Sequence, residues 1–126
     1  MNKKGLSVKK LNSLLEFWQK RLLLNDWNLS IEIVEFKRKD YIQSGDIKVL
    51  PKKMKAAVLL TNNPFRDEET VLVHELVHLI LWDYDIFCEK LALGNSKTKL
   101  KGKHGKYMDK LESTVDHLTK AFLKNR

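Results

Sequence analysis

The stretch VLVHELVHLIL, residues 71–81, sets two histidines and one glutamate in a run that is otherwise entirely aliphatic. Its pattern is His-Glu-x-x-His, formed by His74, Glu75 and His78. Residues four apart lie on the same face of a helix, so both histidines are able to bind one metal ion. Three acidic residues at 67–69 precede the stretch. They favour a helix start there, because carboxylates offset the positive end of the helix dipole.

The chemistry of these three residues indicates a zinc site. Imidazole is a good zinc ligand, and zinc accepts an open fourth position that a water molecule fills. Glu75 follows the first histidine directly, where it is able to take a proton from such a water. The alternative is an ordinary buried helix, but two imidazoles and a carboxylate would then each need a buried polar partner. We therefore predict a zinc ion bound by His74 and His78, with Glu75 as the catalytic base.

Length and composition describe the chain as a whole. Its 126 residues are enough for one domain spanning 1–126, and 43% hydrophobic with 32% charged residues is ordinary for a globular protein. Cys88 is the single cysteine, which excludes an internal disulfide and fits a reducing compartment. We see neither an export signal nor an apolar run of membrane-spanning length, so we expect a cytoplasmic protein without a membrane partner. The net charge of +8 favours an anionic partner.

The first half of the chain predicts a helix followed by strands. Ser7 is a suitable cap for a helix that runs to about Leu24. Apolar and polar residues then alternate from Trp27 to Ile33, as in a half-buried strand. A second strand is expected across Tyr41–Leu50, interrupted at residues 44–46 by a bulge or turn. A third strand, Lys55–Thr61, is nearly all apolar and should be the more interior one.

The second half of the chain predicts the histidine-bearing helix, a basic loop and a last helix. After the histidine-bearing helix, Ile86–Leu93 is amphipathic but of uncertain type. Residues 94–105 are rich in glycine and lysine and are expected to form a loop. A last helix should run from about Lys106 to the C-terminus. The predicted class is therefore α+β, with an N-terminal helix, a small and mostly antiparallel sheet of three or more strands, the His-Glu-x-x-His helix and a C-terminal helix.

The motif resembles that of the zincin metallopeptidases. The similarity is closer to small proteins of the SprT-like and phage or prophage kind, including relatives of the ImmA/IrrE group. It includes the Trp-x-Leu-x-Ile-x-Ile strand from Trp27, the Leu-Val-His-Glu-Leu-Val-His-Leu helix and the last helix from Glu112 to Leu123. The resemblance implies a sheet packed against an active-site helix, and a zinc-dependent peptidase acting on protein or peptide substrates.

The resemblance also implies a third zinc ligand from a later segment. Zincins of this kind supply either a glutamate on the next long helix or a histidine in a His-Gly pair, and Glu112 and His104 match these two possibilities. We favour Glu112, because it lies at the edge of the apolar stripe of the last helix, whereas His104 stands in a lysine-rich loop. Asp116, one turn further, is a candidate acceptor that orients a ligand histidine.

Three functions are compatible with the sequence. In a zinc peptidase, Glu75 would take the proton of the attacking water, and the substrate would add a strand to the sheet edge beside the metal helix. Tyr107, Tyr84 and a lysine of the 97–106 loop are candidates to stabilise the oxyanion. A nucleic-acid-associated SprT-like protein would use the basic 97–106 loop to act on DNA-bound protein, although a solvated loop is the simpler interpretation. A non-catalytic, zinc-stabilised binding module is the third possibility, but Glu75 favours catalysis.

Overall fold

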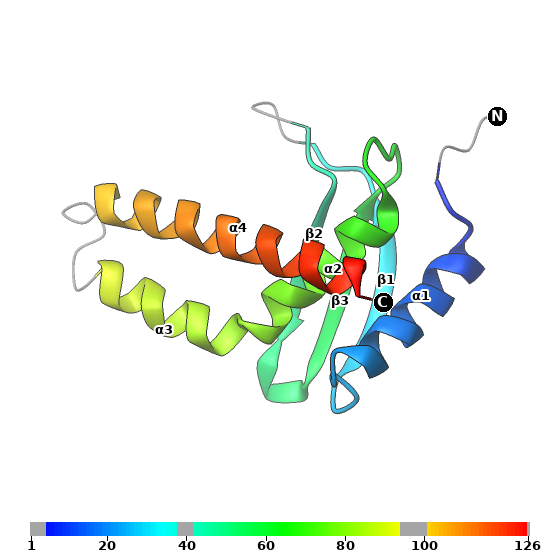
Figure 1. The fold of residues 1–126 in the computed structure, drawn as a ribbon, viewed down its shortest axis with the longest axis horizontal. Helices are drawn as coiled ribbons and strands as arrows, with labels where there is room; N and C mark the ends of the chain where they lie inside the picture. The colour runs from blue at the N-terminus through cyan, green and yellow to red at the C-terminus, as the bar shows by residue number, and fades with distance from the viewer. Residues whose placement is uncertain (1–4, 38–41, 94–100, 126) are drawn as a thin grey trace. The chain divides into compact units, whose positions relative to one another are not determined.

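The computed structural model describes residues 5–37, 42–93 and 101–125 (Figure 1). These residues form four α-helices and a three-stranded sheet, which confirms the α+β class. The chain divides into two compact units, Met1–Leu76 and Val77–Arg126. The division falls inside helix α2, which spans Glu68–Ile80.

Helix α1 spans Val8–Arg21 and starts where the sequence predicts. The Ser7 side chain accepts a hydrogen bond from the Lys10 backbone N–H at 3.1 Å. The helix ends three residues before the expected Leu24, because Leu23 adopts a left-handed backbone conformation with φ 60°. The Gln19 side-chain amide then donates to the carbonyl oxygens of Leu24 and Trp27, at 3.1 and 2.8 Å, and fixes the turn into the first strand.

The three strands are β1 (Asn28–Val34), β2 (Gly45–Leu50) and β3 (Lys55–Thr61), in the order β1-β3-β2. Strand β3 has the predicted bounds and the predicted central place. The expected second strand is shorter than predicted, since it begins only at Gly45, and Tyr41 lies outside the described residues. The sheet is mixed and not mostly antiparallel, because β1 runs parallel to β3 while β2 is antiparallel to it. The apolar pattern of a strand does not show whether the neighbouring strand runs parallel or antiparallel to it.

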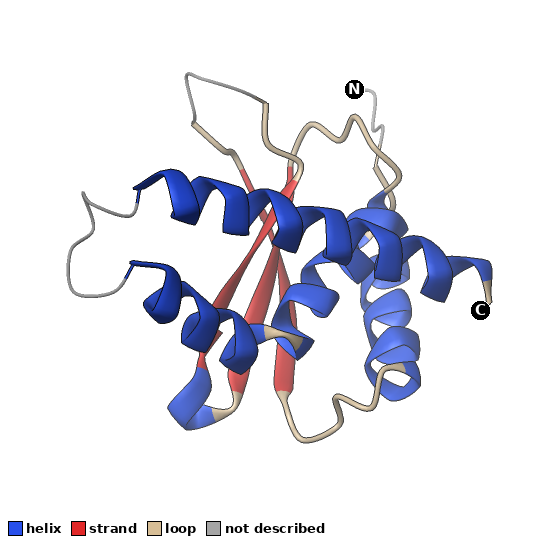
Figure 2. Ribbon diagram, turned by 60° about the vertical axis from the view of Figure 1, so that its left-hand side comes forward, coloured by secondary structure: helices blue, strands red, loops and turns tan. Residues whose placement is uncertain are grey.

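One face of the sheet is apolar and carries the helices of the first unit (Figure 2). Along this face, Leu29 and Ile31 of β1 lie in register with Ala56 and Val58 of β3. The buried side chains of the first unit come from this face and from α1 and α2; among them are Leu11, Leu14, Trp18, Ala56, Val58, Leu60, Val71 and Leu72. The opposite face carries exposed Ser30, Glu32 and Lys48, so the sheet is buried on one side only.

Side-chain hydrogen bonds fix the start of α2. Asp67 accepts bonds from the backbone N–H and the hydroxyl of Thr70, at 3.0 and 2.8 Å, and so caps the helix. The indole N–H of Trp18 donates to Glu69 at 2.7 Å, and the backbone N–H of Leu6 donates to Glu68. The acidic residues that predicted a helix start therefore also tie α2 to α1 and to the segment before it.

The second unit contains α3 (Trp82–Leu93) and α4 (Lys101–Lys124), which lie side by side in both views (Figures 1 and 2). The segment after α2, of uncertain type from the sequence, is thus helical, but its apolar residues do not gather on one face as expected. Helix α4 begins five residues before the predicted Lys106, so the loop prediction is wrong for residues 101–105, while residues 94–100 lie outside the described part. Lysine is a good helix former, and it outweighs Gly102 and Gly105 here. No helix in the described ranges has the length and apolar content that a membrane crossing requires.

Candidate metal centre

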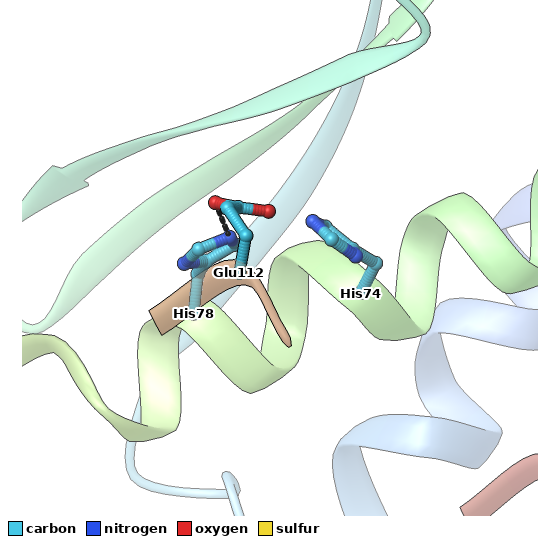
Figure 3. A group of neighbouring side chains, drawn as sticks. All are labelled: His74, His78 and Glu112. Carbon is cyan, nitrogen blue, oxygen red and sulfur yellow. Dashed lines mark ion pairs between the residues drawn. The ribbon is translucent and has the colours of Figure 1, made fainter. Parts of the chain in front are cut away.

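Helix α2 carries His74 and His78 one turn apart, both half-buried (Figure 3). Their neighbours Leu72, Leu76 and Val77 are fully buried, so the aliphatic residues hold the helix in place. Because residues four apart share a face, the two imidazoles point to the same side of α2. This is the arrangement that the His-Glu-x-x-His spacing predicts.

Glu112 of α4 contacts one of these histidines. Its Oε2 lies 3.1 Å from Nε2 of His78, with 49% of the glutamate side chain and 17% of the histidine side chain exposed. Taken together, the possible ligand atoms of His74, His78 and Glu112 all lie within 4.8 Å of one another (Figure 3). The structure therefore brings together the two histidines and the favoured third residue.

No protein-family model, curated protein or solved structure matches this chain. The similarity to zincins thus stays a resemblance carried by the motif residues.

Glu75, the predicted base, is buried, with 7% of its surface exposed. It is not one of the three residues whose ligand atoms converge. Its carboxylate faces the first residue of strand β2: a Cβ atom built on Gly45 would lie 3.5 Å from Glu75 Oε2. Glu75 is therefore shielded from bulk solvent next to an edge strand, and its role as a base stays a prediction.

The other candidate residues lie in α3 and α4. The side chain of His104 is outside the described part of the structure, and Asp116 is exposed one turn after Glu112. Tyr84 is exposed, whereas the Tyr107 hydroxyl donates to the Asp85 carboxylate at 2.6 Å. Burial, followed by the bond to Asp85, raises the pKa of Tyr107 well above that of a free tyrosine. The Tyr107 hydroxyl is thus engaged between two helices of the second unit.

Nucleic-acid binding through the basic 97–106 segment stays an alternative that the described residues do not test. Residues 97–100 and the side chains of residues 101–104 lie outside the described part, and Lys106 is exposed on α4.

Sequence reasoning missed one residue beside the site. Gly45 was expected to interrupt a strand, but it is the first residue of β2 and lies against Val71 and Glu75 of α2. The available signal was the glycine itself, since a glycine within a strand pattern often marks a close approach of another element.

Proposed function

We propose that this chain is a zinc-dependent peptidase in which His74, His78 and Glu112 hold the metal and Glu75 acts as the general base. The observation that carries the proposal is the convergence of two imidazoles and one carboxylate within 4.8 Å. Two histidines and a glutamate are a known ligand set of catalytic zinc, whereas structural sites are closed by four protein ligands.

The separation of two of the donor atoms suits a zinc ion. Ligand atoms placed tetrahedrally at about 2.0–2.1 Å from zinc lie about 3.4 Å from one another. The 3.1 Å between His78 Nε2 and Glu112 Oε2 is close to this value. Three protein ligands leave the fourth position for water and substrate. A zinc ion bound there would supply a Lewis acid that makes a water molecule acidic and polarises a peptide carbonyl.

The residues of the chain would then move the proton. Glu75 accepts the proton from the attacking water and passes it to the nitrogen of the leaving amine, so that the carboxylate is regenerated at the end of the cycle. Its burial keeps it away from bulk water. Glu75 alone thus transfers this proton, and protonation of the leaving amine needs no second acidic residue.

The backbone of strand β2, beside the Glu75 carboxylate, is available to pair with an extended substrate. Strand β2 is an edge of the sheet, and its first residue, Gly45, lies next to Glu75. A peptide that adds to β2 forms main-chain hydrogen bonds that do not depend on its side chains. We propose that the substrate binds in this way, with its scissile carbonyl directed towards the histidines.

Glu75→Gln tests the catalytic part of the proposal. The substitution preserves size and removes the base, so zinc content and fold should stay as in the wild type while cleavage of a fluorogenic peptide library falls by about 100-fold or more. Glu16→Gln, an exposed position on α1, is the matched control and should cleave normally. Removal of the metal with a chelator should stop cleavage, and added zinc should restore it.

Two results would contradict the proposal in different ways. Unchanged cleavage by the Glu75→Gln variant would show that another group is the base. A wild-type protein that binds zinc but cleaves no peptide would instead favour the non-catalytic zinc-stabilised binding module.

A further inference from the structure

Gly45 occupies a position where the edge strand β2 lies directly against helix α2. It is half-buried and pairs with Leu60 of β3 in the register of the sheet. The preceding residue, Ser44, accepts a hydrogen bond from the backbone N–H of Thr61 at 3.1 Å. The backbone around Gly45 is therefore fixed to the central strand.

No side chain fits at Gly45 without movement of its neighbours. A Cβ atom there would lie 2.5 Å from Cγ1 of Val71 and 3.2 Å from the carbonyl oxygen of Leu59. The first separation is far inside van der Waals contact, and the second is set by backbone that belongs to β3. The Val71 side chain would therefore have to move.

Val71 has little room to move. It is 6% exposed, and the void beside it is too narrow to hold a water molecule. As a β-branched residue in a helix, Val71 is nearly restricted to one side-chain rotamer. A side chain at position 45 would therefore push against the α2 backbone itself.

A shift of α2 at Val71 would reach Glu75. The two residues are four apart and share a face of the helix. Glu75 Oε2 lies 3.5 Å from the same Cβ position, so Gly45 borders both Val71 and the carboxylate. The missing side chain thus sets the distance between β2 and the turn of α2 that carries Glu75.

We propose that Gly45 is a positioning residue, which places the Glu75 carboxylate by admitting Val71 against the edge strand. The effect of Gly45 on cleavage rests on the proposed peptidase function. Its effect on the position of the Glu75 carboxylate does not. The atoms nearest to a Cβ at position 45 belong to Val71, Leu59 and Glu75 and to none of the three proposed metal ligands.

The test compares four variants: Gly45→Ala, Val71→Ala, the double substitution, and Gly105→Ala as the matched control. A Cβ at Gly105 meets no atom within 4 Å, so this second glycine-to-alanine change adds the same methyl group in open space. Val71→Ala removes the atom that a methyl group at position 45 would strike, and the double variant should therefore restore the native spacing.

Two readouts report on Glu75. The first is the ¹³C chemical shift of its carboxyl carbon in metal-free protein labelled at glutamate, with the resonance assigned from Glu75→Gln. The second is the split between kcat and KM for a fluorogenic peptide. Small misplacements of a catalytic group lower rates by up to about 100-fold. Gly45→Ala should therefore displace the Glu75 resonance and lower kcat by about tenfold or more, with KM little changed.

The double variant decides the outcome. Return of the Glu75 resonance and of kcat towards wild-type values, with Gly105→Ala unchanged throughout, supports the proposal. If the Gly45→Ala variant does not fold, the double variant gives the test. A double variant that folds supports the proposal, and a double variant that does not fold overturns it. A Gly45→Ala protein that matches Gly105→Ala in both readouts also overturns it. Absence of cleavage in every variant, the wild type included, contradicts the peptidase function, and the ¹³C shifts then decide the role of Gly45 alone.

Discussion

Glu112 contacts His78 although about half of its side chain, 49%, is exposed to solvent. An ion pair in such an exposed place contributes at most about 1 kcal/mol, because water screens both groups and two side chains lose freedom. The fold therefore depends little on this contact. A large effect of Glu112 substitution on metal binding would have to come from the loss of a ligand and not from unfolding.

Tyr107 allows a test of a single hydrogen bond between α3 and α4. Tyr107→Phe removes the hydroxyl that donates to Asp85, and we expect the free energy of unfolding at pH 7 to fall by about 1 kcal/mol. The pKa of Tyr107 is raised in the folded protein, so folding favours its neutral form. The contribution is complete below about pH 10, the ordinary tyrosine pKa, and is lost as the pH rises above it.

Urea unfolding at neutral and at high pH measures both effects. The Tyr107→Phe variant should approach the wild type in stability as the pH rises above about 10. In an Asp85→Ala background, the same substitution should have a much smaller effect at pH 7, because the closer of the two acceptors, the carboxylate, is gone and only the backbone carbonyl oxygen at 3.4 Å remains. An equal loss of stability with and without Asp85 would mean that the hydrogen bond is not its source.

Among the elements, α2 depends most clearly on its first turn. Asp67→Ala removes the acceptor of two hydrogen bonds from Thr70, and we expect the free energy of unfolding to fall by about 1 kcal/mol. Asp67→Ser keeps a capping oxygen and should retain most of the stability. Chemical denaturation of the two variants checks this. If serine is as destabilising as alanine, Asp67 does not act as the helix cap.

The elements also differ in how well the sequence predicts them. Strand β3 and the start of α1 have local signals, a continuous apolar run in one case and a capping serine in the other, and both were predicted correctly. The start of α4 was misplaced because Gly102 and Gly105 indicate a loop, while the lysines around them favour a helix. The early end of α1 depends on the backbone of Leu23, for which no sequence signal was available.

For the whole molecule, the sequence predicts which residues are apolar but not how distant segments pair. The parallel pairing of β1 with β3 depends on the path of the chain, which places β2 at the opposite edge. At the candidate site, the spacing of His74 and His78 follows from helix geometry alone. Choosing Glu112 required a resemblance to a family, and the place of Gly45 beside Glu75 required the packing of α2 on the sheet.

The zinc affinity of the purified protein, measured by competition with a chromophoric chelator, tests the central claim most directly. The wild type should bind about one zinc per chain. His74→Ala should lose stoichiometric zinc binding. Substitution of a residue that only supports a metal ligand typically weakens metal binding by about tenfold or more. Because Glu112 is proposed to be a ligand itself, Glu112→Ala should weaken zinc binding by more than that. His117→Ala, an exposed histidine of α4, is the control, and His104→Ala should also bind normally. Wild-type affinity in Glu112→Ala, together with loss of zinc in His104→Ala, would contradict the account.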